Sequence, residues 1–231
     1  MPGNENVSAL VLRRADYRDY DRMVTLLTAE KGRIEAVVRG CRRAKSELMN
    51  AAEPFVCGQY QLFYNHDRYS VVQCRVTDGF YPLREDYDRL SAGAEWLRIL
   101  EKVSVENLPS EALFRLALDA LSYLSYSSLQ EKLLTTMFYL KLSYLSGFAP
   151  AADKCALCGR AASETRLGFD AGRGGCVCAL CAPNAKSLSE GARRVLLKAP
   201  KAPFKSVEML KDYPDTEEAG ERIREIVKNW I

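Results

Sequence analysis

Four cysteines arranged as two Cys-x2-Cys pairs have the clearest chemistry in this chain. The tetrapeptide Cys-Ala-Leu-Cys occurs at residues 155–158 and again at 178–181. Each pair lets two thiolates turn onto one ion about 2.3 Å away, and two pairs complete a tetrahedron around zinc. Four thiolates leave no position for water or substrate, so the expected ion is structural. The expected ligands of this Zn²⁺ are Cys155, Cys158, Cys178 and Cys181.

The other cysteines leave some alternatives open. Cys176 lies two residues before Cys178 and competes with it as a ligand, although Cys178 completes the second Cys-x2-Cys pair. The cluster can also be interpreted as a redox-active thiol pair or as small buried residues. Three cysteines without paired spacing are interpreted as buried thiols: Cys41, Cys57 and Cys74.

A second candidate site is a basic segment. Between residues 31 and 45 the only acidic side chain is Glu35, and the basic residues are Lys31, Arg33, Arg39, Arg42, Arg43 and Lys45. Basic clusters of this kind bind nucleic acid without regard to base sequence, because phosphate contacts release counterions. Nearby tyrosines can stack bases; they are Tyr17, Tyr20, Tyr60, Tyr64 and Tyr69. The alternative is a solvated loop with its tyrosines in a strand core, and a net charge of +3 does not decide between the two.

The elements that must position the basic segment are predicted to be strands. Apolar runs and alternation predict five strands, over residues 7–12, 23–27, 34–38, 55–64 and 69–76. A glycine turn at 30–32 joins two of them as a hairpin, and residues 46–52 suit a short helix. Five short antiparallel strands favour a small barrel, which has no free edges.

Helical periodicity begins beyond Pro82. Three packed helices are expected over residues 90–103, 113–124 and 133–145, and two more over 187–198 and 216–230. Between them, residues 155–181 are rich in glycine and cysteine and would form a loop without a metal. The pattern predicts an α+β protein, a barrel followed by helices.

Several function classes are disfavoured. No apolar stretch reaches the roughly 18 residues of a membrane span, and the polar start does not resemble a signal peptide. A cytoplasmic protein without membrane contact is therefore expected. We find no P-loop, H-E-x-x-H or G-x-S-x-G motif, so no catalytic residues are assigned and no enzyme activity is predicted.

Two regions of the chain resemble a known family. Residues 21–34 read Asp-Arg-Met-Val-Thr-Leu-Leu-Thr-Ala-Glu-Lys-Gly-Arg-Ile, and the match continues through Gly-Cys-Arg-Arg-Ala-Lys-Ser at 40–46 to residues 52–55. A second match covers residues 140–150 and runs into 155–159 and 174–178. Together they resemble the RecO family of bacterial recombination mediators. Not all members keep the cysteines, so the zinc prediction rests on this chain's own four ligands.

The resemblance implies a fold and an activity. It implies an OB-fold DNA-binding domain at residues 1–81 and a helical domain at 82–231 with a zinc-binding insert at 153–183. It implies binding of single- and double-stranded DNA, annealing of complementary strands, and loading of RecA onto strands coated by single-stranded-DNA-binding protein (SSB). RecR, the C-terminal tail of SSB and a functional link to RecF are the implied partners, at the nucleoid.

Carried onto this chain, the resemblance assigns DNA contacts to the six basic residues between 31 and 45. Two alternatives from other classes stay open. The first is a protein-interaction adaptor that does not bind DNA directly, and the second is a cysteine-dependent redox or zinc enzyme.

Overall fold

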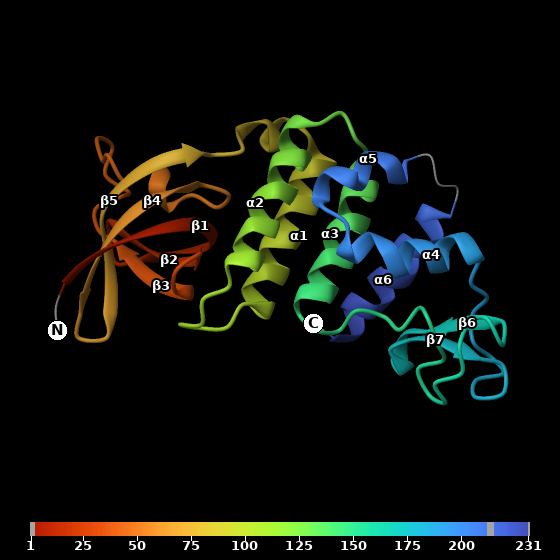
Figure 1. Cartoon of the computed structure of the whole chain (residues 1–231). Coiled ribbons are helices and arrows are strands. Elements are labelled where there is room, and N and C mark those ends of the chain that lie inside the picture. Colours follow the sequence, from red (N-terminus) through yellow and green to blue (C-terminus); the bar gives the residue numbers. More distant parts are fainter. Residues whose placement is uncertain (1–2, 212–214, 231) are drawn as a thin grey trace. The chain divides into compact units, whose positions relative to one another are not determined.

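The structure is a computed structural model that describes residues 3–211 and 215–230 (Figure 1). Contacts divide the chain into two compact units, Met1–Tyr126 and Ser127–Ile231. The first unit holds the barrel with two helices, and the second holds the remaining helices with the cysteine-rich insert. A domain boundary between residues 81 and 82 stays a prediction.

The first unit begins with a closed five-stranded barrel. Its strands are β1 (Gly3–Tyr17), β2 (Asp21–Thr28), β3 (Gly32–Val38), β4 (Cys57–Asn65) and β5 (Arg68–Asp78). They close in the order β1-β2-β3-β5-β4, and only β3 and β5 pair in parallel. A five-stranded barrel of this kind is an OB-fold, so the predicted fold class is confirmed.

Strand β1 closes the barrel because it is long enough to pair twice. Residues 3–10 pair with β4 and residues 9–17 pair with β2, and the register shifts between Val11 and Arg13. Such a bulge bends a strand. Val7, Ala9 and Val11 fill the barrel core. Leu10 and Leu12 are also buried, and α1 lies against β1, so the middle of the strand is apolar throughout instead of alternating.

The predicted hairpin between β2 and β3 turns at a glycine. Gly32 has φ +68°, and a Cβ at this position would lie 2.1 Å from the carbonyl oxygen of Leu108. The segment after α1 approaches so closely because its backbone bonds to β3. The Arg33 N–H donates to the Val105 carbonyl (3.2 Å), and the Asn107 N–H donates to the Arg33 carbonyl (3.1 Å).

The rest of the first unit consists of the helical segments η1 (Asn50–Ala52), η2 (Tyr81–Glu85), α1 (Tyr87–Val103) and α2 (Glu111–Tyr126). Asp86 caps α1 by accepting from the Arg89 N–H (3.1 Å). The helix predicted at 46–52 is shorter than expected, one 3-10 turn over η1. Strand β4 begins at Cys57, not at Phe55, because Phe55 has φ +73°, which strands do not adopt.

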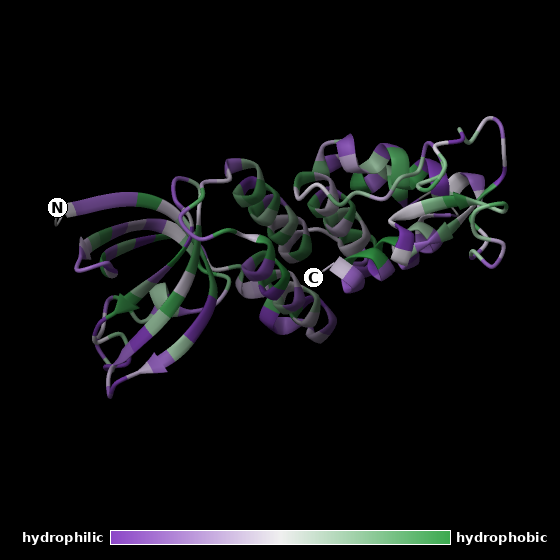
Figure 2. Cartoon of the chain, turned by 90° about the horizontal axis from the view of Figure 1, so that it is seen from below, coloured by the Kyte–Doolittle hydropathy of each residue, from purple (hydrophilic) through white to green (hydrophobic). Residues whose placement is uncertain are grey.

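The second unit contains α3 (Glu131–Leu145), β6 (Leu167–Asp170), η3 (Ala171–Arg173), β7 (Gly175–Cys178), α4 (Glu190–Lys198), η4 (Ala199–Lys201), η5 (Phe204–Ser206), α5 (Val207–Leu210) and α6 (Thr216–Trp230). Helix α6 packs against α3 and α4. The helices carry both apolar and polar residues (Figure 2), and the buried residues Ala219, Ile223 and Val227 of α6 have the spacing of an amphipathic helix. The short helix α5 was not predicted. Of the three central helices, α1 and α2 belong to the first unit and α3 to the second.

Hydropathy also bears on membrane insertion. Within residues 3–211 and 215–230, no helix has both the length and the apolar composition that crossing a bilayer requires.

Candidate metal centre and nucleic-acid interface

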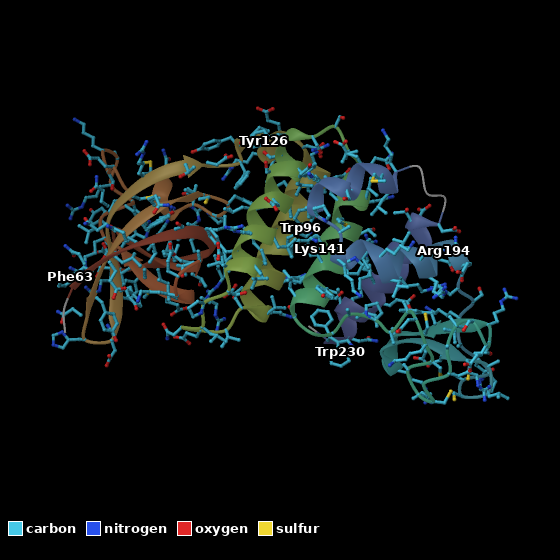
Figure 3. All side chains as sticks on the ribbon, in the orientation of Figure 1. Phe63, Trp96, Tyr126, Lys141, Arg194 and Trp230 are labelled. Carbon is cyan, nitrogen blue, oxygen red and sulfur yellow. The ribbon has the colours of Figure 1, made fainter. Side chains whose placement is uncertain are left out.

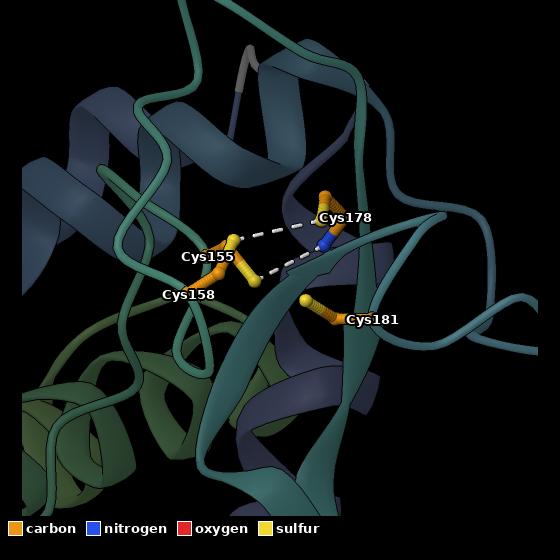
Figure 4. A group of neighbouring side chains, drawn as sticks. All are labelled: Cys155, Cys158, Cys178 and Cys181. Atoms are coloured by element: carbon orange, nitrogen blue, oxygen red, sulfur yellow. Dashed lines mark hydrogen bonds between the residues drawn. The ribbon is translucent and has the colours of Figure 1, made fainter.

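The structure brings the four predicted ligands together (Figure 4). The sulfurs of Cys155, Cys158, Cys178 and Cys181 all lie within 4.8 Å of one another. Those of Cys158 and Cys178 are 3.8 Å apart. A tetrahedral ion with metal–sulfur bonds of about 2.3 Å places its sulfurs roughly 3.8 Å apart, so this group can hold a metal ion.

Local backbone geometry explains how each pair converges. The Gly159 N–H donates to the Cys155 carbonyl (2.9 Å), and the Cys181 N–H donates to the Cys178 carbonyl (3.0 Å), so each Cys-x2-Cys segment is a tight turn. Gly159 has φ +74°, the left-handed region that favours glycine. The Cys178 N–H points at the Cys155 sulfur (3.4 Å), a contact that favours a thiolate there.

A short hairpin supports the second pair. Strands β6 and β7 are antiparallel, and the second pair begins at the last residue of β7. The first residue of β7, Gly175, lies close to the backbone of Ala151. A Cβ at this position would lie 2.5 Å from that backbone, so glycine is required. The sequence did not predict this small sheet.

Hydrogen bonds within the group shift the pKa values of its thiols. Backbone N–H groups of Cys158 and Cys178 lower the pKa of Cys155 to about 6. Side-chain hydrogen bonds to Cys178 and Cys158 raise the pKa of the Cys181 thiol to about 12. A cation at the centre of the group would favour the thiolate form of all four cysteines.

Cys176 is not part of this group. It is fully buried, and burial raises the pKa of its thiol to about 12. Its sulfur is not among the four that lie within 4.8 Å of one another, so Cys176 is a packing residue in this structure. Of the three isolated cysteines, Cys41 and Cys57 are buried and Cys74 is half-buried.

The six basic residues do not form one cluster. Lys31 and Arg33 lie at the start of β3, whereas Arg39, Arg42, Arg43 and Lys45 follow its end. Seven strand residues at about 3.3 Å each separate the two groups by roughly 20 Å. A sequence distance of a few residues thus becomes a large spatial distance.

The two basic side chains at the start of β3 already bond to other residues of the same chain. Lys31 forms an ion pair with Glu5 (2.7 Å), which raises the pKa of its ammonium. The guanidinium of Arg33 donates to the carbonyl oxygen of Glu101 (3.2 Å). Both side chains are half-buried, so phosphate contacts here would compete with existing bonds.

The group after β3 forms what we call the basic loop surface, defined as Arg18, Tyr20, Arg39, Arg42, Arg43 and Lys45. All six side chains are exposed. The loop is held against the β1–β2 turn: the Gly40 N–H donates to the Asp21 carboxylate (2.8 Å), and the Arg42 N–H donates to the Tyr20 carbonyl (3.1 Å). The guanidinium of Arg43 lies 5.1 Å from the Tyr20 ring centroid.

Some charge on this surface is compensated. Arg42 makes a long contact with Asp16 (3.5 Å). Arg39, Arg43 and Lys45 have no ion pair among residues 3–211 and 215–230, so their charge faces solvent. The sequence prediction omitted Arg18, which lies outside the basic segment and joins it only because the β1–β2 turn meets the loop after β3.

The five tyrosines proposed for stacking lie in different environments. Tyr20 is 52% exposed, whereas Tyr60 is fully buried and donates to the Ala51 carbonyl (2.9 Å). Tyr60 is therefore a core residue. Tyr17, Tyr64 and Tyr69 are half-buried.

A second basic region was not predicted from the sequence. Residues 193–211 contain one acidic side chain, Glu208, and the basic residues Arg193, Arg194, Lys198, Lys201, Lys205 and Lys211. Within the second unit, this segment borders an apolar groove of about 240 Å³ between α3, α4 and α5. Met137 and Val195 line the groove together with Lys198 and Arg194, the last of which is labelled in Figure 3.

Comparisons with known proteins agree with the resemblance. The family model "Recombination protein O N terminal" matches residues 1–80, and "Recombination protein O C terminal" matches residues 84–229. A "DNA repair protein RecO" of Acetivibrio thermocellus is 31% identical over 82% of this chain and 76% of its own. One of Caldanaerobacter subterraneus subsp. tengcongensis is 28% identical over 96% of this chain and 91% of its own. The chain therefore belongs to the RecO family, whose members are DNA repair proteins.

Proposed function

We propose that this protein is a non-enzymatic recombination mediator that binds single- and double-stranded DNA through the basic loop surface and anneals complementary strands. The observation that carries the proposal is the set of exposed arginines beside the β1–β2 turn of an OB-fold. OB-folds bind oligonucleotides with the face of strands 2 and 3 and with the loops beside it.

Annealing by such a surface needs no acid, base or nucleophile. Two polynucleotides repel each other, and cationic side chains reduce that repulsion by replacing the counterions that would otherwise be held. Arg39, Arg43 and Lys45 suit this role because their charge is not neutralised by a carboxylate in the described residues. The lowered repulsion gives complementary bases time to pair.

The groove in the second unit supports a protein partner. An acidic peptide with apolar side chains fits an apolar groove with a basic rim, and the proposed occupant is the C-terminal tail of SSB. Met209 is 69% exposed at the groove, so apolar surface is available there. Lys141 of α3 donates to the carbonyls of Pro200 (3.4 Å) and Ala202, which holds the adjoining segment in place (Figure 3).

The cysteine group is proposed to hold Zn²⁺ in a structural role. The four sulfurs provide thiolate ligands at the spacing zinc requires, and a bound ion would stabilise an insert that has little apolar core. RecR, RecA and RecF are proposed as further partners from the family resemblance, with the protein acting at the nucleoid in the cytoplasm.

The decisive experiment measures annealing of SSB-coated complementary strands and, separately, DNA affinity as a function of salt. The variant is Arg42→Gln/Arg43→Gln, and the matched control is Arg98→Gln/Arg115→Gln, which removes two exposed charges from α1 and α2. On single-stranded DNA, the logarithm of the wild-type binding constant is expected to fall linearly with the logarithm of the salt concentration, with a slope of about 0.7 per phosphate contact. The loop variant is expected to have a shallower slope.

The same experiment distinguishes the proposed function from the adaptor hypothesis. An adaptor without direct DNA contact predicts identical DNA behaviour for the loop variant and the control. Equal annealing by both variants and wild type would contradict the proposal.

A further inference from the structure

The basic loop surface has a carboxylate at its base. Asp21 is the first residue of β2 and is half-buried. Its Oδ1 atom accepts a hydrogen bond from the Gly40 N–H at 2.8 Å. A carboxylate and a phosphate repel each other, so charge alone would disfavour an acidic residue beside arginines that bind DNA. The conformation of the loop after β3 gives Asp21 a different effect.

This loop is built from consecutive turns. Gly40 has φ +64°, the left-handed region that favours glycine. The Arg43 N–H donates to the Gly40 carbonyl (3.1 Å), and the Ser46 N–H donates to the Arg43 carbonyl (3.0 Å). Within the first turn, Cys41 is fully buried and belongs to the barrel core. With Cys41 fixed in the core, Arg42 and Arg43 are exposed.

Two hydrogen bonds fasten the loop to the β1–β2 turn. One joins Gly40 to the side chain of Asp21, and the other joins the Arg42 N–H to the Tyr20 carbonyl (3.1 Å). A substitution can remove the first of these bonds, which would leave a half-buried N–H without its partner and the backbone at Gly40 free to move. The loop arginines would then have to become ordered when DNA binds, at a cost in affinity.

A second acidic residue in the same turn carries the same charge without this bond. Asp19 is exposed and lies between Arg18 and Tyr20 in the sequence. Within residues 3–211 and 215–230, the Asp19 carboxylate forms no hydrogen bond or ion pair. Of the two carboxylates, only that of Asp21 holds the loop.

We propose that Asp21 is a positioning residue for DNA binding. Its carboxylate holds Gly40 so that Arg42 and Arg43 meet phosphates in a fixed geometry, and this effect outweighs the repulsion between the carboxylate and DNA. The inference rests on the proposed DNA binding by the basic loop surface. Charge alone predicts the opposite sign, because removing any carboxylate near the loop would then strengthen DNA binding.

The test compares wild type with Asp21→Ala, Asp21→Asn and the matched control Asp19→Ala. Each protein is titrated with a single-stranded oligonucleotide, and amide hydrogen exchange is measured over residues 39–46. Asp21→Ala is expected to weaken DNA binding roughly fivefold and to speed exchange in the loop. Asp19→Ala is expected to strengthen binding by up to about twofold, with exchange unchanged. Asp21→Asn keeps an acceptor oxygen, so it should bind DNA at least as tightly as wild type.

Weaker binding by Asp21→Ala, with rescue by Asp21→Asn and no loss in Asp19→Ala, supports the inference. Binding by Asp21→Ala that equals or exceeds that of wild type would overturn it. An equal loss of affinity in Asp21→Asn or Asp19→Ala would also overturn it, because the charge and not the bond would then matter.

Failure of the proposed DNA binding gives a different result. If wild type binds no DNA, the proposed function fails; if wild type binds and Asp21→Ala binds equally well, the role of Asp21 alone is wrong. Thermal denaturation checks that Asp21→Ala folds, and Gly40→Ala decides if it does not. A Cβ at Gly40 would lie 3.8 Å from the Arg43 side chain, so this variant strains the turn without a clash or a change of charge. It should also weaken DNA binding, and unchanged binding would overturn the inference.

Discussion

At the scale of single residues, the two kinds of candidate site differ in how they depend on their neighbours. The four thiols are placed by tight turns within each Cys-x2-Cys pair, so their chemistry is largely local. The arginines of the basic loop surface gain their shared position from strands that end at the same side of the barrel. Substitutions at the two sites should therefore have separable effects.

Replacing Cys158 with serine is expected to release the metal and unfold the insert, because three thiolates and a hydroxyl bind zinc far more weakly than four thiolates. The measurement is metal content per chain together with protease sensitivity of residues 150–185. Cys176→Ser is the matched control, since that thiol lies outside the group. Loss of metal from Cys176→Ser with retention by Cys158→Ser would contradict the assignment.

Glu190 is expected to contribute stability that depends on pH. Arg193 and Arg194 lower the pKa of its carboxyl from 4.5 to about 2 in the folded protein. Because the folded pKa is the lower one, the contribution is complete above pH 4.5 and is lost as pH falls towards 2. Glu190 is largely exposed, so Glu190→Gln should cost less than about 1 kcal/mol at pH 7.

The check is the difference in unfolding free energy between Glu190→Gln and wild type, measured from pH 7 to pH 3. The difference should narrow as the pH falls. If the difference in unfolding free energy grew towards low pH, the contribution of Glu190 would not come from its ionised carboxylate.

At the scale of elements, close helix packing in the second unit depends on a missing side chain. A Cβ on Gly220 of α6 would lie 2.4 Å from the hydroxyl oxygen of Thr136 on α3. That hydroxyl already donates to the Lys132 carbonyl (2.9 Å), so it cannot move away without losing a bond. The glycine therefore sets the distance between the two helices.

Gly220→Ala is expected to lower the stability of the second unit. Alanine favours the helix by about 1 kcal/mol relative to glycine, but overpacking costs about 1–3 kcal/mol. Chemical denaturation compares this variant with Glu221→Ala, an exposed position on the same helix. Stabilisation by Gly220→Ala would mean that α3 and α6 do not pack this closely.

At the scale of the whole molecule, the chain consists of two units with separate cores. The barrel and the proposed DNA surface belong to the first unit, while the cysteine group and the apolar groove between α3, α4 and α5 belong to the second. Metal should therefore stabilise the second unit and leave DNA contacts of the first largely intact.

Removal of metal by a chelator is expected to lower the unfolding temperature of the second unit only. Calorimetry with and without chelator measures this, and single-strand binding measured on the same samples should be partly retained. Complete loss of DNA binding on chelation, restored by zinc, would show that the two units do not act independently.

The sequence by itself determined the parts of this protein that depend on local spacing. Alternation and apolar runs predicted five strands, helical periodicity predicted the five long helices, and paired cysteines predicted the metal-binding group. Each of these features depends on the spacing of residues that are close together in the sequence, because a strand, a helix and a Cys-x2-Cys turn are all local structures.

Only the tertiary structure decided which side chains share a surface. Barrel closure buried Tyr60, separated Lys31 from Arg39, and added Arg18 to the basic loop surface. The folding of α3, α4 and α5 around one groove brought basic residues of 193–211 to its lining, which their sequence had not suggested. The physical reason is that these contacts join segments far apart in the chain. The local periodicity of the sequence does not predict such long-range contacts.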